Sequence, residues 1–257
     1  MNQIISINCN TNLKIRIRKS TDRGYANHGW LKSRFSFSFA DYYDPRYTQF
    51  GCLRVINEDD IEQGNGFPTH PHKEFNIFTY IVNGSLTHRD SMNNQEVVKP
   101  GDVQFTCAGT GIMHSEFNWG DRIGHFLQIW LKPNQRNLVP YYKTMHFSDE
   151  QKNGKFCQII SSVEKEGSIL SHSNAEVFAT ILNKRKQSTY HLKSSRNAHV
   201  HMVGLQGASI MINGEILYGG DAAFITHQSK DGVTLRFVGN SNSNIKNEFL
   251  FFDLKDE

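Results

Sequence analysis

The stretch Gly84-Ser-Leu, followed by Gly101-Asp-Val-Gln-Phe105, decides the fold because the chain repeats it once. The second copy is Gly207-Ala-Ser-Ile, followed by Gly220-Asp-Ala-Ala-Phe224. Each copy reads as a strand, a glycine turn, a strand, a further turn, a Gly-Asp step and another apolar strand. In a chain of 257 residues, this repetition predicts two tandem β-domains that meet near residues 140–150.

Short strand patterns extend outward from the repeat in both directions. Lys14-Ile-Arg-Ile-Arg18 and Phe35-Ser-Phe-Ser-Phe39 alternate with period two, as half-buried strands do. Compact runs of β-branched and aromatic residues, such as Ile77-Phe-Thr-Tyr-Ile-Val82, end at turn signals such as Asn83-Gly84. No segment carries a long apolar period of 3.6 residues. We therefore expect an all-β protein with sandwich or barrel architecture.

Composition and charge exclude several classes of protein. The 28 Lys and Arg residues exceed the 25 Asp and Glu residues by three, so no strong field favours a nucleic-acid or membrane partner. The four cysteines lie far apart without a Cys-x-x-Cys pair, which argues against a zinc ribbon, a thioredoxin-type motif or a disulfide framework. Neither a signal-peptide pattern nor an apolar run of about 18 residues is present, so we expect a cytoplasmic protein.

The strongest chemical signal consists of two ligand pairs, His70-Pro-His72 and His114-Ser-Glu116. Residues i and i+2 of a strand project from one face, so two adjacent strands can direct both pairs to one point. Three imidazoles and one carboxylate suit a divalent Fe, Ni, Cu, Co, Mn or Zn ion. With six ligands, such an ion keeps two positions for water, O₂ or substrate. The predicted metal ligands are His70, His72, His114 and Glu116.

The alternative for these four residues is a polar, hydrogen-bonded barrel mouth without an ion. Burying three imidazoles and a carboxylate without a cation would cost desolvation energy with little return, which favours the metal. The second pair, His199-Val-His201, is not expected to bind metal, because the repeat aligns these residues with Asn76 and Phe78. Three isolated histidines are expected on the surface or in support of a ligand: His28, His88 and His125.

Several stretches resemble the bacterial pirin signature, most closely that of pirin-like proteins with quercetin 2,3-dioxygenase activity. The resemblance is specific over residues 14–145 and looser through the rest of the chain. It is carried by His28-Gly-Trp-Leu, Phe37-Ser-Phe-Ala-Asp-Tyr-Tyr-Asp-Pro45, Leu53-Arg-Val-Ile-Asn-Glu-Asp59, Gly66-Phe-Pro-Thr-His-Pro-His-Lys73 and Ala108-Gly-Thr-Gly-Ile-Met-His-Ser-Glu116.

The resemblance implies a bicupin, with two tandem antiparallel β-barrels of the jelly-roll type. Residues 1–13 are then a flexible tail, 14–145 a metal-binding barrel, and 146–257 a barrel without a metal site. It also implies iron(II), or another divalent metal, at the four predicted ligands. Asn76 stands where pirins commonly have Glu, and Phe35 stands where related sequences tend to have His. We therefore expect the hydrogen bonds around the ligands to differ from the family pattern.

The activity that the resemblance implies is cleavage of a flavonol such as quercetin by O₂, which releases carbon monoxide and a depside. Glu116 would be the catalytic residue, as the general base that accepts the flavonol hydroxyl proton. One alternative is a non-catalytic metal-binding pirin that acts as a redox-sensitive regulator of a protein partner. Another is a non-oxidative cupin enzyme, such as a sugar isomerase with zinc as Lewis acid. A bicupin pairs its barrels within one chain, so we expect a monomer.

Overall fold

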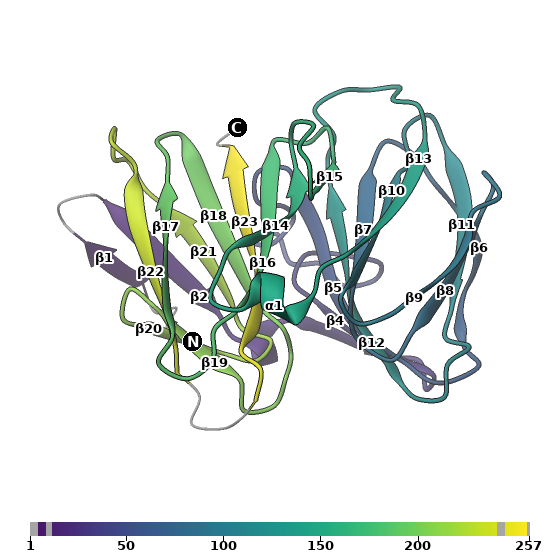
Figure 1. Ribbon diagram of the computed structural model, residues 1–257, viewed down its shortest axis with the longest axis horizontal. Helices are drawn as coiled ribbons and strands as arrows, with labels where there is room; N and C mark the ends of the chain where they lie inside the picture. Colours follow the sequence, from purple (N-terminus) through teal and green to yellow (C-terminus); the bar gives the residue numbers. More distant parts are fainter. Residues whose placement is uncertain (1–4, 9–11, 241–244, 256–257) are drawn as a thin grey trace. The chain divides into compact units, whose positions relative to one another are not determined.

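The computed structural model describes residues 5–8, 12–240 and 245–255, and strands make up nearly all of its regular structure (Figure 1). Its one α-helix among these residues is the single turn α1 (Asp149–Lys152). The tail expected at residues 1–13 lies partly outside the described residues, at 1–4 and 9–11. Between them, β1 (Ile5–Asn8) pairs antiparallel with β2 (Leu13–Arg18).

The chain divides into two compact units whose segments alternate along the sequence. The N-terminal unit contains Arg23–Phe147 and Ser161–Asn174, and the C-terminal unit contains Met1–Asp22, Ser148–Ile160 and Ala175–Glu257. This division differs from the predicted boundaries of 14–145 and 146–257 at residues 161–174 and at the start of the chain. There β2 pairs with β21 (Ala222–Thr226) of the C-terminal unit. A period-two pattern reveals that a strand forms, but it carries no information about the distant strand with which it pairs.

Two antiparallel sheets build the N-terminal unit. The larger sheet has the order β13-β10-β7-β12-β5-β4-β3, and the smaller has the order β6-β11-β8-β9. The strands are β3 (Gly24–Asn27), β4 (Leu31–Phe35), β5 (Leu53–Ile61), β6 (Gly66–His72), β7 (Asn76–Asn83), β8 (Leu86–Asp90), β9 (Gln95–Val98), β10 (Asp102–Cys107), β11 (Ile112–Phe117), β12 (Gly124–Leu131) and β13 (Tyr141–His146). The short strand β15 (Ile169–Leu170) also belongs to this unit.

The C-terminal unit repeats the central part of this arrangement. Its sheets have the orders β1-β2-β21-β18-β23-β16-β14 and β17-β22-β19-β20, so β21, β18, β23 and β16 occupy the places of β10, β7, β12 and β5. The strands not yet bounded are β14 (Cys157–Ser161), β16 (Ala175–Ile181), β17 (Gln187–Leu192), β18 (Arg196–Met202), β19 (Ser209–Ile212), β20 (Glu215–Tyr218), β22 (Val233–Gly239) and β23 (Glu248–Lys255). The predicted all-β fold of two jelly-roll domains is confirmed.

The turn that ends β7 shows why the repeated glycine is needed. Gly84 adopts a φ of +73°, a conformation that side chains rarely tolerate, and a Cβ atom there would lie 2.8 Å from the Ile123 carbonyl oxygen. Gly207 adopts a φ of +80° at the matching turn of the second copy. The repeated glycine therefore marks a backbone position that the turn between the two sheets requires in each unit.

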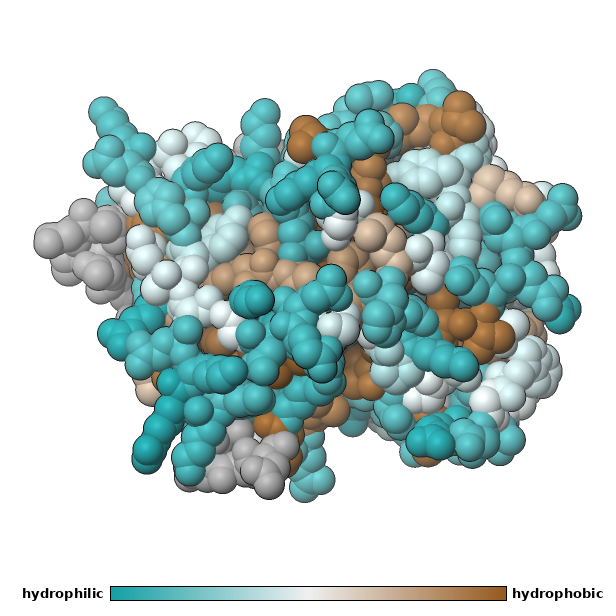
Figure 2. All heavy atoms as spheres, in the orientation of Figure 1, coloured by the Kyte–Doolittle hydropathy of each residue, from teal (hydrophilic) through white to brown (hydrophobic). Residues whose placement is uncertain are grey.

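A large apolar core lies inside the C-terminal unit. Large apolar side chains such as Phe237, Phe249 and Phe251 fill the C-terminal unit and are fully buried. On the face of the molecule drawn in Figure 2, hydrophilic residues predominate and hydrophobic residues appear in smaller patches between them. Within the described part of the chain, no helix has the length and apolar character needed to cross a membrane.

Candidate metal centre

Strands β6 and β11 bring the two predicted ligand pairs together. They pair antiparallel, and His70 lies directly opposite His114 in their register. Gly66 begins β6 at a point of very close approach, because a Cβ atom there would lie 2.2 Å from the Glu116 carbonyl oxygen. Any side chain at this position would push β6 away from β11 and separate the two pairs.

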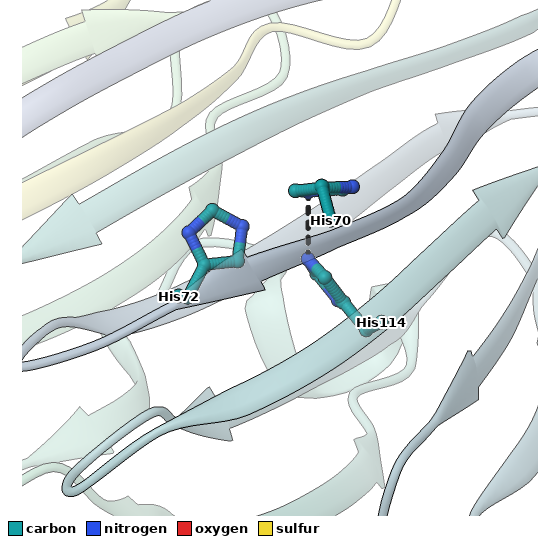
Figure 3. Close-up of side chains that lie close together, drawn as sticks. All are labelled: His70, His72 and His114. Atoms are coloured by element: carbon teal, nitrogen blue, oxygen red, sulfur yellow. Dashed lines mark hydrogen bonds between the residues drawn. The ribbon is translucent and has the colours of Figure 1, made fainter.

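Three imidazoles converge between these strands, as Figure 3 shows. The ring centroids of His70, His72 and His114 lie 4.5–4.8 Å apart in every pairing. One ring nitrogen from each lies within 4.8 Å of the others, a spacing that could hold a metal ion. Nε2 of His70 and Nε2 of His114 lie within hydrogen-bond distance of each other, at 3.1 Å, as the dashed line in Figure 3 marks.

Hydrogen bonding and burial leave lone pairs free at this point. His70 donates its Nδ1–H to the carbonyl oxygen of Pro68 at 2.8 Å, which leaves Nε2 as the unprotonated nitrogen. Burial, together with the neighbouring His114 and His70, lowers the pKa of His72 to about 4, so this ring is neutral at pH 7. Nε2 of His72 is buried and has no hydrogen-bond partner among the described residues. Neutral imidazoles with free lone pairs are the form in which histidine binds metal.

Glu116 supplies a carboxylate beside this cluster. It is fully buried, and its oxygens lie within 4.8 Å of ligand atoms of His114 and His88, in a second group that shares His114 with the first. Burial alone would raise the pKa of Glu116, but His114, His88 and the amide of Gln104 together hold it below its usual value. The carboxylate is therefore ionised at neutral pH. Its charge balances a cation among buried imidazoles, so this donor set fits a divalent transition metal.

The larger sheet positions the Glu116 carboxylate through three donors. Gln104 donates to Oε1 at 2.9 Å, Thr79 to Oε1 at 3.4 Å, and Gln128 to Oε2 at 3.0 Å. These donors face one another in register across β10, β7 and β12. A carboxylate offers about four lone-pair positions, so one remains for a cation.

The corresponding row of the C-terminal unit is apolar. In the N-terminal unit this row consists of Gln104, Thr79, Gln128 and Asn57. At the same places in the sheet order, the C-terminal unit has Ala223, Val200, Phe251 and Phe178, each paired in register with the next. No donor in this row could orient a buried carboxylate. His199 and His201 are fully buried on β18, and the ring of His199 packs on Phe224 with centroids 4.6 Å apart.

His88 belongs to the centre, although in the sequence it looks isolated. It faces Glu116 across the β8–β11 register. Gln104 donates its second amide hydrogen to Nδ1 of His88 at 3.2 Å, and Nε2–H of His88 donates to Asp90 at 3.0 Å. The signal that would have revealed His88 is the register of β8 against β11, which a single sequence does not contain.

An aromatic cavity of about 410 Å³ opens onto His70 and His72. Its apolar wall includes Phe39, Phe67 and Trp130, and the Trp130 ring packs edge-on against His72 with centroids 4.9 Å apart. Its polar wall includes Ser33, Asn57, Asp59 and Gln128. The volume falls in the range of small-molecule sites, and the shape of the wall suits a flat ring.

The remaining residues singled out in the sequence occupy different places. His28 and Phe35 line the cavity. His125 hydrogen-bonds to Glu58 at 3.0 Å; burial lowers the pKa of His125, but Glu58 outweighs this and raises it. Asn76 donates to Ser171 and Ser173 instead of supporting a ligand. Asn76 therefore anchors the 161–174 segment within the N-terminal unit.

Comparisons with known proteins agree with this geometry. The family profile described as "Pirin" matches residues 16–131, and that described as "Quercetinase C-terminal cupin domain" matches residues 158–254. A protein named quercetin 2,3-dioxygenase from Escherichia coli O157:H7 is 39% identical over 229 residues, which cover 87% of this chain and 97% of that protein. The chain belongs to the pirin family.

Two further relatives are bacterial proteins. A pirin-like protein from Caulobacter vibrioides is 35% identical over 84% of this chain and 93% of its own length. The crystal structure of the bacterial pirin YhhW in complex with nickel(II), from Escherichia coli, superposes with a TM-score of 0.85. It is 36% identical and covers 95% of this chain and 100% of that one. A divalent metal is thus compatible with this fold, and the donor set of this pirin suits one.

Replacing Gln104 with leucine tests how much the centre depends on its hydrogen-bonded support. Gln104 touches both Glu116 and His88, so its loss frees the carboxylate to rotate away from the imidazoles. Loss of such an outer partner typically weakens metal affinity by about 10- to 100-fold, and we expect that range here. Competition with a chelator measures it. The control Gln95→Leu, on exposed β9, is expected to bind like the wild type, and equal affinity in both variants would contradict the supporting role.

Proposed function

We propose that this pirin is a metal-dependent dioxygenase that cleaves a flavonol such as quercetin with O₂, releasing carbon monoxide and a depside. The observation that supports it best is the convergence of three imidazoles beside an aromatic cavity of about 410 Å³. The name of the Escherichia coli O157:H7 relative, quercetin 2,3-dioxygenase, points to the same reaction. A metal-centred cavity with flat apolar walls suits a planar polyphenol.

The proposed ligands of a single divalent ion are His70, His72, His114 and Glu116. We propose iron(II) as the native ion, while the nickel complex of the relative YhhW indicates that such centres accept other divalent metals. When bound, an ion of this kind acidifies a coordinated hydroxyl group and provides the redox chemistry that O₂ requires.

The protein's own groups would perform binding and proton transfer. The aromatic wall around Trp130 and Phe67 holds the flat ring and excludes water from it. Glu116 accepts the 3-hydroxyl proton of the flavonol as general base, because its carboxylate is ionised and fully buried. Gln104 and Gln128 keep the carboxylate in place as it takes the proton, and the long Thr79 contact, at 3.4 Å, is the one that gives way to the proton.

Oxygen uptake tests the proposal directly. The protein is purified without oxygen, its metal is quantified by elemental analysis, and quercetin is then added with O₂ in an oxygen electrode. We expect one O₂ consumed and one carbon monoxide released for each quercetin lost. Stoichiometric metal with no consumption of quercetin would contradict the dioxygenase and favour a metal-binding regulator. Consumption without carbon monoxide would contradict the 2,3-cleavage.

A further inference from the structure

The polar row that supports Glu116 continues beyond it into the cavity wall. Gln104, Thr79 and Gln128 all donate to the carboxylate, and Gln128 pairs in register with Asn57 on β5. Asn57 lines the cavity and is 3% exposed. Its Oδ1 atom is buried and has no hydrogen-bond partner among the residues that the structure describes. The row therefore ends in an acceptor that the metal centre does not use.

Asp59 stands on the same face of β5, two residues and about 7 Å farther along the strand. It is 2% exposed and lines the cavity. Its carboxyl accepts a hydrogen bond from Ser33, whereas Oδ1 is buried and finds no partner in the described part of the chain. A buried polar atom without a partner costs free energy, and a ligand in the cavity can supply that partner.

The surroundings of Asp59 favour its neutral form. Burial is the main cause that raises the pKa of Asp59 to about 7; the Ser33 hydrogen bond lowers it, and the nearby carboxylates of Glu116, Glu58 and Asp60 add smaller increases. A neutral carboxyl group can donate a hydrogen bond as well as accept one. Asp59 belongs to neither group of metal-ligating side chains found in the described residues.

Trp130 adds a donor to the same cavity. Its Nε1–H is buried and has no acceptor among the described residues, and its ring forms part of the wall. The cavity thus presents an acceptor at Asn57, a carboxyl group at Asp59 and a donor at Trp130, set in walls that are otherwise largely aromatic. A flat aromatic ring with hydroxyl substituents complements this set, because each hydroxyl both donates and accepts.

We infer that Asp59, together with Asn57, binds a ring hydroxyl of the substrate remote from the metal centre. This contact makes the cavity selective for polyhydroxylated aromatic compounds over analogues that lack the remote hydroxyls. The inference rests on the proposed function for the position of the substrate and extends it to substrate selection. Asp59 is in this role a specificity-determining residue and not a metal ligand.

The test compares two flavonols that share the 3-hydroxyl and ring carbonyl. Quercetin carries further hydroxyls on both outer rings, and 3-hydroxyflavone carries none. Protein loaded with redox-inactive Zn(II) is titrated with each compound without oxygen, and quenching of tryptophan fluorescence reports affinity. We expect Asp59→Leu to weaken quercetin binding by about 10- to 100-fold and 3-hydroxyflavone binding by less than about 3-fold. Asp59→Asn keeps a donor and an acceptor and is expected to retain most of the preference.

A matched control is Glu62→Gln, because Glu62 is an exposed acid directly after β5 that does not line the cavity. It is expected to behave like the wild type. Asn57→Leu provides a second variant, with a smaller loss in the same direction. Elemental analysis of each variant confirms that the metal content is unchanged.

The inference is overturned if wild-type protein binds both flavonols equally, or if Asp59→Leu weakens both by the same factor. Its failure is distinct from that of the proposed function. If binding depends on the remote hydroxyls but the iron-loaded protein takes up no oxygen, the proposed dioxygenase activity is contradicted and the Asp59 site is supported. If the protein cleaves quercetin but Asp59→Leu leaves the ratio of the quercetin and 3-hydroxyflavone affinities unchanged, the dioxygenase is supported and the Asp59 site is contradicted.

Discussion

Replacing His114 with alanine is expected to lower metal affinity by more than about 100-fold and to abolish oxygen uptake on quercetin. His114 is the one residue common to both ligand groups among the described residues, and its Nε2 lies 3.1 Å from that of His70. Without His114, no imidazole connects the pair His70 and His72 on β6 with the Glu116 carboxylate. Loss of a proposed direct ligand should exceed the effect of losing an outer hydrogen-bond partner such as Gln104.

Elemental analysis after dialysis against a chelator measures this loss, with circular dichroism as the check that the strands are intact. The matched control is His191→Ala, an exposed histidine on β17 of the C-terminal unit, which should retain wild-type metal content. Full metal occupancy in His114→Ala would show that the ion binds elsewhere.

The substitution Glu116→Gln is expected to lower the turnover of quercetin strongly. The substitution keeps the size of the side chain but removes the negative charge, and its amide cannot accept a proton as a carboxylate does. We expect the turnover of quercetin at saturating metal to fall by about 100- to 10,000-fold, the usual contribution of a general base. Metal affinity should fall as well, because the amide group meets the donors Gln104 and Gln128.

The two effects are separated by titrating the metal until turnover no longer rises. An exposed acid, Glu62, provides the control Glu62→Gln, for which an unchanged rate is expected. Full turnover by Glu116→Gln or Glu116→Ala at saturating metal would assign the proton transfer to a different group.

Much of the fold can be predicted from the sequence because the jelly-roll repeats its turns. The glycine turns at Gly84 and Gly207 lie at matching places in two sheets of the same strand order, as the repeat predicts. The allocation of β2 to a unit cannot be predicted in this way. Leu13–Arg18 shows the correct alternation, but its partner is β21, and pairing between distant strands leaves no local signal.

The same distinction between local and distant signals applies to the residues of the candidate site. The proposed ligands are readable because each pair has the i, i+2 spacing of a single strand face. His88, Gln104 and Asp59 gain their roles only from neighbours on other strands or from burial, so nothing in their local sequence distinguishes them. The Gly-Asp-x-x-Phe repeat does contain one clue, since Gln104 in the first copy becomes Ala223 in the second.

The allocation of β2 to the C-terminal unit has a consequence during synthesis on the ribosome. Arg18 pairs with Ala222, about 200 residues later, whereas the N-terminal unit is complete once Asn174 has emerged. At about 5–20 residues per second, β2 must wait roughly 10–40 s for its partner. An unpaired strand edge invites aggregation for that time, but Lys14, Arg16 and Arg18 alternate with its apolar residues, and such charges oppose edge-to-edge pairing. The basic alternation of this strand thus protects the nascent chain until the second unit closes around it.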